Sequence, residues 1–204
     1  MEQNPLRTLV SELPAHGAEE VYRRCAGLLP AWRRRQAESF RNLADRLQCA
    51  KAYLLLCQLL EEATGQHAVA PSFVYGEYGK PRLAAWPHLH FNMSHCPKAV
   101  MCTLGYTDVG CDVEEIPDTV DEGVLSLCFS PEEQRWICGA ANPQVEFARQ
   151  WTRKEALLKM HGIGLTDQLP SLMESPLARD VAFQTTVCRR GGYVYTVCSP
   201  LRTQ

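Results

Sequence analysis

A short acidic segment, residues 110–114, holds two residues suited to metal chemistry. Its sequence, Gly-Cys-Asp-Val-Glu, has the pattern of a strand. Because side chains alternate along a strand, Asp112 and Glu114 are expected to point to the same face. The neighbouring residues are small or apolar, and carboxylates within an apolar strand need a partner. A divalent cation is one such partner, and a solvated strand face is the ordinary alternative.

A second segment, residues 151–159, has the sequence Trp-Thr-Arg-Lys-Glu-Ala-Leu-Leu-Lys and the pattern of a helix. Glu155 and Lys159 would lie one turn apart on one face. Taken alone, such a pair is the common surface ion pair of helices, worth about 0.2–0.5 kcal/mol. If the helix meets the acidic strand, three carboxylates and at least one ammonium group converge. Such a set suits Mg²⁺ held against a polyphosphate, because Mg²⁺ takes one or two carboxylates and completes its shell with phosphate oxygens.

Two further motifs precede the acidic strand. In Phe-Asn-Met-Ser-His, residues 91–95, Ser94 and His95 could offer a hydroxyl and an imidazole N–H to a phosphate. A structural histidine is the alternative, and a hydrolytic pair is disfavoured because no Gly-x-Ser-x-Gly elbow surrounds the serine. In Gly-Lys-Pro, residues 79–81, glycine permits close approach to a ligand, lysine supplies charge and proline stiffens the exit. An ordinary turn would have the same composition.

A basic run consists of Arg33, Arg34 and Arg35, and Arg46 follows within the next helical pattern. Most such clusters are solvated faces. They can also neutralise the phosphates of a nucleotide or of a nucleic acid. The net charge of the whole chain is −2, so no global field draws it toward nucleic acid or a membrane.

The composition is that of a globular protein with no membrane segment. The 204 residues are 46% hydrophobic and 22% charged, and no run of about 18 apolar residues occurs. The ten cysteines include no Cys-x-x-Cys pair and no zinc-finger spacing. The N-terminus lacks the layout of a signal peptide. We therefore expect a cytoplasmic protein whose cysteines are small buried hydrophobes.

The order of the predicted elements indicates an α+β fold. Helices are predicted at residues 19–28 and 42–63, in the segment just before Cys128, in a segment that begins at residue 131, and at residues 143–161. Strands are predicted at residues 6–10, 72–76, 91–94, 99–106, 109–114, 181–189 and 193–198. We expect two halves, residues 1–104 and 105–204. Each would pack a small, mostly antiparallel sheet on a long helix.

Taken together, the motifs resemble those of the 4′-phosphopantetheinyl transferases, specifically the surfactin-type group with two fused halves. Gly-Lys-Pro, Phe-Asn-x-Ser-His, Gly-x-Asp-x-Glu and Trp-x-x-Lys-Glu-Ala-x-x-Lys occur in family order between about residues 75 and 165. The Gly-Ile-Gly-Leu that follows, ending at Leu165, also fits. The resemblance implies a pseudo-two-fold pair of halves with a ligand cleft between them. It also implies Mg²⁺-dependent transfer of the 4′-phosphopantetheine arm of coenzyme A to a serine of an apo acyl, peptidyl or aryl carrier protein. Adenosine 3′,5′-bisphosphate would be released. This is the reaction of a holo-acyl-carrier-protein synthase.

The resemblance also implies roles for individual residues. The metal ligands, for Mg²⁺ or in its place Mn²⁺, would be Asp112, Glu114 and Glu155. The pyrophosphate contacts would be Lys159 and Lys154. Contacts to the 3′-phosphoadenosine end would come from Ser94, His95, Gly79, Lys80 and Pro81. The 3′-phosphate would be held by basic residues of the N-terminal part, for which the candidates are Arg33, Arg34, Arg35 and Arg46.

Some alternatives remain open on sequence grounds. Glu155 and Glu133 are both candidates for the general base, and we favour Glu155 because its motif places it at the metal. The rival functions are an inactive coenzyme A-binding relative and a nucleic-acid-binding module that uses the basic run. We expect a monomer that binds neither nucleic acid nor a membrane. The carrier protein and its pathway, whether fatty acid, polyketide or nonribosomal peptide synthesis, are not encoded by these motifs.

Overall fold

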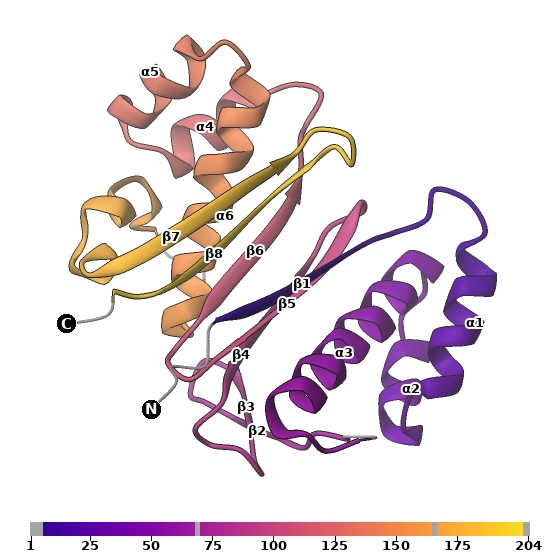
Figure 1. Cartoon of the computed structure of the whole chain (residues 1–204). Coiled ribbons are helices and arrows are strands. Elements are labelled where there is room, and N and C mark those ends of the chain that lie inside the picture. The colour runs from indigo at the N-terminus through magenta and orange to yellow at the C-terminus, as the bar shows by residue number, and fades with distance from the viewer. Residues whose placement is uncertain (1–5, 68–69, 165–166, 202–204) are drawn as a thin grey trace.

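Two three-stranded antiparallel sheets, each with one long helix on its face, form the framework of the protein (Figure 1). The computed structural model describes residues 6–67, 70–164 and 167–201. Leu165, the end of the predicted Gly-Ile-Gly-Leu motif, lies outside the described residues.

The first half contains the elements up to residue 105. They are β1 (Arg7–Glu12), α1 (Ala18–Leu28), α2 (Ala31–Glu38), α3 (Leu43–Thr64), β2 (Phe73–Tyr75), β3 (Pro81–Leu83), β4 (His90–His95) and β5 (Ala99–Gly105). The sheet has the order β1-β5-β4, and α3 packs on it. The core between them includes Leu56, Leu59 and Leu60 of α3, and Phe91 of β4. A separate hairpin joins β2 to β3.

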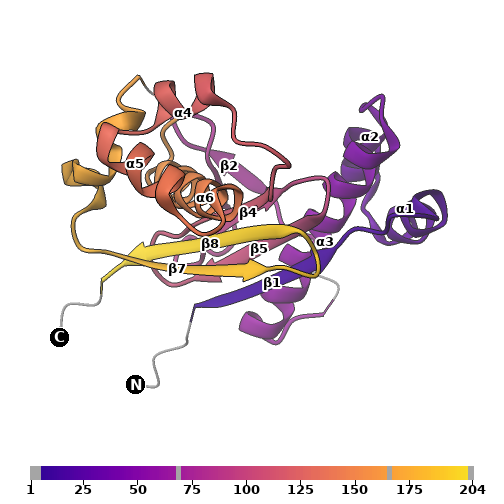
Figure 2. The same ribbon diagram turned by 90° about the horizontal axis from the view of Figure 1, so that it is seen from above.

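The remaining elements follow residue 105. They are β6 (Gly110–Glu115), α4 (Glu122–Cys128), α5 (Pro131–Gly139), α6 (Pro143–His161), the 3₁₀ turns η1 (Leu169–Glu174) and η2 (Pro176–Ala178), β7 (Val181–Cys188) and β8 (Tyr193–Pro200). The sheet has the order β6-β8-β7. In both halves the first strand is followed by helices, the last of these helices is long, and the last strand lies in the middle of the three-stranded sheet. Figure 2 shows α3 and α6 on different sides of the sheets.

The α+β class and the small antiparallel sheets are therefore confirmed, as are most of the predicted elements. The caps predicted for α5 and α6 are also present. Ser130 and Glu133 form a capping box, and Asn142 accepts a hydrogen bond from the backbone N–H of Val145. Helix α2 was not predicted, because its run of arginines has no apolar stripe. Its inner face is formed by Ala37, which is fully buried. In the described part of the chain no helix is long and apolar enough to cross a membrane.

The two sheets meet where β4 and β6 lie side by side. The side chain of Asn92 on β4 accepts a hydrogen bond from the backbone N–H of Cys111 on β6 at 3.0 Å, so an amide side chain links two edge strands. A buried apolar cluster spans the same seam and contains Met101 from the first sheet with Val113 and Val197 from the second. Burial of apolar surface and a satisfied polar link therefore hold the halves together.

Gly110 allows β6 to lie against α6. A Cβ atom at this position would come within 1.9 Å of the carbonyl oxygen of Ala156 and 2.6 Å of the amide nitrogen of Met160. Both obstacles are backbone atoms of α6 and cannot rotate away. The glycine of the Gly-x-Asp-x-Glu motif thus sets the distance between the strand that carries Asp112 and the helix that carries Lys159.

We predict that Gly110→Ala lowers the free energy of unfolding by about 2–4 kcal/mol, because strand and helix must separate to admit the methyl group. Urea denaturation followed by circular dichroism would measure it. Gly139→Ala is the matched control, since a Cβ there meets nothing within 4 Å. Equal stability of the two variants would contradict the close-approach argument.

Candidate functional site

The Asp112 carboxylate is the centre of the candidate site. It lies on β6 and is 1% exposed. Its Oδ1 atom accepts hydrogen bonds from the Ser94 hydroxyl at 2.8 Å and from the Lys159 ammonium at 2.5 Å. Lys159 also donates to the Ser94 hydroxyl at 3.0 Å. The structure therefore brings together Ser94 of the first half with Asp112 and Lys159 of the second, three residues that sequence motifs had selected separately.

Lys159 is held in its charged form by Asp112. Burial alone would lower the pKa of this lysine, but the charge of Asp112 and its hydrogen bond outweigh that effect and raise the pKa. The charge at this position is consequently permanent at neutral pH. A fixed cation of this kind can stabilise negative charge that develops on a substrate phosphate.

Glu114 lies two residues along β6 from Asp112, as the strand pattern predicted. Its Oε1 atom accepts a hydrogen bond from the indole N–H of Trp151 at 3.4 Å. Burial and then the charge of Asp112 raise the pKa of Glu114 to about 7, against the smaller opposing effects of Trp151 and Lys159. The sequence pattern gave no signal for this contact between Trp151 and Glu114.

Glu155 is the third carboxylate, on the face of α6 that also carries Lys159. Within the described residues its carboxylate makes no hydrogen bond. Burial and then the charge of Asp112 raise its pKa, and Lys159 partly opposes the rise. The shared influence of Asp112 on Glu114 and Glu155 shows that the three carboxylates interact electrostatically.

A divalent cation fits this donor set as an open site. The second oxygen of Asp112, Oδ2, is buried and has no hydrogen-bond partner among the described residues. A cation there would satisfy it and would relieve the repulsion that raises the pKa values of Glu114 and Glu155. Among the described residues, no group of three or more His, Cys, Asp or Glu side chains is placed so that it could hold a metal ion. Further ligands would have to come from a substrate or water, as is usual for Mg²⁺.

His95 ends β4 next to this group and is exposed. Although the side chain reaches solvent, partial burial of its ring and then the positive charge of Lys159 lower its pKa, so the neutral imidazole is favoured at physiological pH. A neutral imidazole can donate one N–H to a phosphate oxygen. The histidine is therefore placed to meet a ligand that reaches Lys159.

Lys80 fastens the Gly-Lys-Pro turn to the second half. Its ammonium donates to the carbonyl oxygens of Val109 at 3.1 Å and Met160 at 2.7 Å. Burial lowers its pKa. Gly79 has φ +79°, a conformation that glycine adopts without strain, and Pro81 begins β3.

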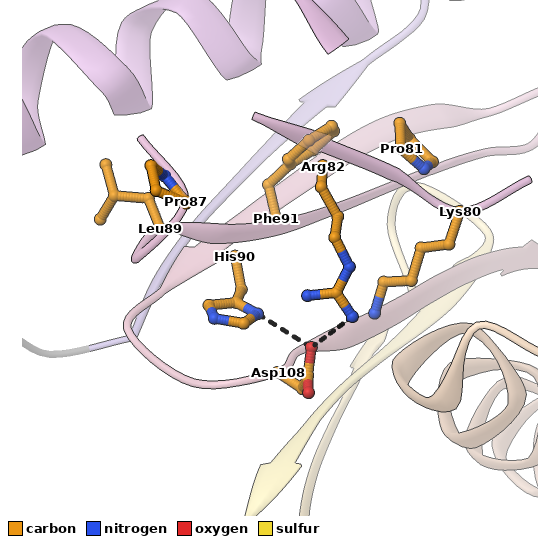
Figure 3. A pocket seen from close by; sticks show the side chains of 8 residues that line it. All are labelled: Lys80, Pro81, Arg82, Pro87, Leu89, His90, Phe91 and Asp108. Carbon is orange, nitrogen blue, oxygen red and sulfur yellow. Dashed lines mark hydrogen bonds and ion pairs between the residues drawn. The ribbon is translucent and has the colours of Figure 1, made fainter. Parts of the chain in front are cut away.

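A pocket adjoins this turn (Figure 3). Asp108 accepts from the ring of His90 at 2.8 Å and lies 3.7 Å from the guanidinium of Arg82. Leu89 and Phe91 supply apolar lining. Lys80 and Pro81 thus border a pocket of mixed polar and apolar character, although the ammonium of Lys80 is engaged by backbone carbonyls.

Arg33, on α2, makes internal contacts. Its guanidinium donates to the carbonyl oxygen of Cys49 at 3.1 Å and to Gln36 at 2.7 Å, and it lies 5.3 Å from the ring centroid of Tyr53. These contacts fasten α2 to α3. They support a structural contribution from Arg33.

The other arginines differ in exposure: Arg34 is exposed, whereas Arg46 is half-buried, as Arg33 is. Arg34 donates through Nε to the carbonyl oxygen of Ala26, and Arg46 does the same to Phe40. Arg35 is exposed on the same helix as Arg34. None of these contacts, within the described residues, involves Asp112 or Lys159.

Lys154 and Glu133 contact each other away from the Asp112 group. Lys154 has a side chain that is 0% exposed, and its ammonium lies 2.8 Å from Glu133 Oε2. Glu133 also accepts from the backbone N–H of Ser130 as part of the capping box. Among the described residues, neither Lys154 nor Glu133 makes a hydrogen bond with a predicted site residue outside this pair.

Comparison with known proteins agrees with the geometry. The family model of the 4′-phosphopantetheinyl transferase superfamily matches residues 108–197. A 4′-phosphopantetheinyl transferase of Bacillus subtilis is 30% identical over 152 residues, which are 72% of this chain and 66% of the relative. The 4′-phosphopantetheinyl transferase AcpT of Salmonella typhimurium is 35% identical over 135 residues, 64% of this chain and 68% of the relative.

The 4′-phosphopantetheinyl transferase psf-1 of Bacillus pumilus is 29% identical over 141 residues, 68% of this chain and 60% of the relative. This chain therefore spans about two thirds of the length of these relatives. The matched region 108–197 contains Asp112, Glu114, Glu155 and Lys159, the residues whose geometry defines the site. The chain belongs to the 4′-phosphopantetheinyl transferase superfamily, a group of transferases.

Proposed function

We propose that this protein transfers the 4′-phosphopantetheine group of coenzyme A to a serine of an apo carrier protein, with Mg²⁺ as its metal, and releases adenosine 3′,5′-bisphosphate. The observation that carries the proposal is the Asp112 group. Ser94 and Lys159 share one of its carboxylate oxygens, and the other is buried with no hydrogen-bond partner among the described residues. A substrate with a pyrophosphate and a metal would complete that arrangement. The family relationship supports the same reaction.

The two halves would be related by a pseudo-two-fold axis with coenzyme A bound between them. The shared strand order, first-third-second in each sheet, supports this arrangement. So does the origin of the site residues, because Ser94 and His95 come from β4 while Asp112 and Lys159 come from β6 and α6. A chain that already contains two such halves has less need to pair, and we infer that it acts as a monomer.

Metal and phosphate would be held by different residues of the site. Asp112, Glu114 and Glu155 would hold Mg²⁺, or Mn²⁺ in its place. When bound, the metal would neutralise the oxygens around the attacked phosphorus. Lys159 would contact the pyrophosphate, where its fixed charge opposes the build-up of negative charge on the leaving group. His95 would donate its N–H to the 3′-phosphoadenosine end.

The attacking serine hydroxyl of the carrier must lose a proton. We favour Glu155 as the acceptor, because its carboxylate makes no hydrogen bond within the described residues and its raised pKa makes it a better base than an ordinary carboxylate. Glu133 is the weaker candidate, since one of its oxygens already accepts from Lys154 and from Ser130.

The remaining coenzyme A contacts would come from the first half. Gly79, Lys80 and Pro81 would form the adenine-side wall, next to the pocket of Figure 3. Arg34, Arg35 and Arg46 would serve the 3′-phosphate better than Arg33, whose guanidinium is engaged by Cys49 and Gln36. The ten free cysteines support a location in the reducing cytoplasm.

Incubation of the protein with coenzyme A, Mg²⁺ and an apo carrier protein should give a carrier heavier by one phosphopantetheine. Mass spectrometry of the intact carrier measures the shift. A carrier whose acceptor serine is replaced by alanine is the control. If acyl, peptidyl and aryl carriers all kept their mass, the proposed reaction would be wrong.

The variants Glu155→Gln and Asp112→Asn should separate chemistry from stability. Both are expected to lower kcat by at least about 100-fold. Glu155→Gln should leave the melting temperature unchanged or higher, because it removes a half-buried carboxylate that makes no hydrogen bond within the described residues. Asp112→Asn should also lower stability, because it leaves Lys159 without its partner carboxylate. Near-normal turnover of Glu155→Gln at saturating Mg²⁺ would refute its role.

Glu114 predicts a pH dependence of stability in metal-free buffer. Its folded-state pKa, about 7, lies above the ordinary glutamate value of 4.5, so its contribution to stability is fully present below about pH 4.5 and is lost as the pH rises through 7. Glu114→Gln replaces the titrating carboxyl group by an amide, so the variant does not lose this stability as the pH rises. The variant should be more stable than the wild type by about 1–3 kcal/mol at pH 8 and nearly equal to it at pH 4. Urea titrations with a chelator at both pH values would test this, and a constant difference would contradict it.

A further inference from the structure

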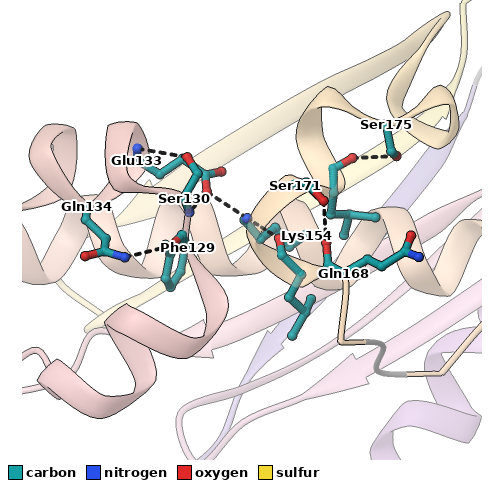
Figure 4. Close-up of polar contacts among 10 residues, drawn as sticks. Phe129, Ser130, Glu133, Gln134, Lys154, Gln168, Ser171 and Ser175 are labelled. Atoms are coloured by element: carbon teal, nitrogen blue, oxygen red, sulfur yellow. Dashed lines mark hydrogen bonds and ion pairs between the residues drawn. The ribbon is translucent and has the colours of Figure 1, made fainter.

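A buried ion pair joins α6 to the segments that cover its outer side (Figure 4). Lys154 of α6 donates to Glu133 Oε2 at 2.8 Å and to the carbonyl oxygen of Leu169 at 2.6 Å. Glu133 lies in the first turn of α5, and Leu169 begins η1. One ammonium group therefore fastens both α5 and η1 to the helix that carries Glu155 and Lys159.

The free-energy cost of burying a charge favours this arrangement over others in which Lys154 is unpaired. A lysine that is fully removed from water is costly unless its charge is paired and its N–H groups are bonded. Glu133 is committed as well, because the same oxygen accepts from the backbone N–H of Ser130. Neither group is free to meet a phosphate while this arrangement holds.

The pair is connected to Glu114 by aromatic contacts. The Lys154 ammonium lies 5.0 Å from the ring centroid of Phe129. The centroid of Phe129 lies 6.3 Å from that of Trp151, at an angle of 53° between the rings. Trp151 in turn donates its indole N–H to Glu114. Each step is a contact between neighbouring side chains.

We propose that the Lys154–Glu133 pair is a positioning unit for Glu114, acting through Phe129 and Trp151. The pair seats Phe129, the ring of Phe129 sets the orientation of Trp151, and the indole N–H holds the Glu114 carboxylate toward Asp112. Lys154 and Glu133 then act through other residues and contact neither the pyrophosphate nor the attacking serine. The expected effect on transfer kinetics rests on the proposed function. The expected effect on the placement of Trp151 rests on the contacts alone.

A double-mutant cycle between Lys154→Met and Trp151→Phe tests the kinetic consequence. Each single variant should raise the Mg²⁺ concentration needed for half-maximal transfer by about tenfold, as loss of a residue that orients a metal ligand commonly does. The double variant should be no worse than Trp151→Phe alone, because both changes act on one path. If the two effects multiplied in the double variant, the path through Trp151 would be refuted.

Leu56→Ala supplies the matched control for stability. Leu56 is fully buried in α3 of the first half and has no part in the path. Its loss should lower the melting temperature without changing the Mg²⁺ dependence. A shift in Mg²⁺ dependence equal to that of Lys154→Met would show that general destabilisation is sufficient, and would overturn the proposal. Glu133→Gln, which can still accept hydrogen bonds, should give a smaller effect than Lys154→Met.

A second measurement does not require turnover. In protein labelled with ¹⁵N at tryptophan, the indole resonance of Trp151 is the one lost in Trp151→Phe. Lys154→Met should move this resonance, whereas Leu56→Ala should not. If the Trp151 resonance did not move in Lys154→Met, the inference would be overturned, even if this variant still transferred phosphopantetheine. If the resonance moved, the inference would be supported, even if the wild-type protein showed no transfer. Phe129→Leu interrupts the path at its middle and replaces Lys154→Met if that variant does not fold.

Discussion

The ion pair between Asp112 and Lys159 is the interaction on which the site depends. Asp112 is almost completely buried, and an unpaired carboxylate there would be strongly disfavoured. Lys159 supplies the opposite charge and the Ser94 hydroxyl supplies a further hydrogen bond. The partners come from a helix, a strand of the second sheet and a strand of the first. A single buried carboxylate thus imposes the relative placement of three elements.

The close approach of β6 and α6 serves the same pair. With any side chain at residue 110 the strand and the helix would be separated, and a lysine one turn from Glu155 would not reach Asp112 in the same geometry. On the other side of β6, the Asn92 amide and the apolar cluster around Met101 and Val113 fix the first half. Apolar packing and hydrogen bonding therefore favour the same placement of the two sheets at this seam. Such agreement is typical of regions in which the sequence favours a single structure.

The parts of this structure with regular patterns were predictable from sequence. The alternation in β6 placed Asp112 and Glu114 on one face, and the caps at Ser130 and Asn142 located two helices. Helix α2 was missed because it lacks an apolar stripe. The roles of Trp151 and Lys154 were also beyond local pattern, since each depends on a partner many residues away. Side-chain contacts between distant segments carry no periodic signal, and only the three-dimensional arrangement reveals them.

The site combines Ser94 of one half with Asp112 and Lys159 of the other. This matters for the number of complete sites at low protein concentration. If the halves were separate chains, the fraction of complete sites would fall with dilution. Because a short connection between β5 and β6 joins them, the local concentration of one half near the other is fixed by the chain itself. The number of assembled sites then follows the number of protein molecules in direct proportion, at any expression level.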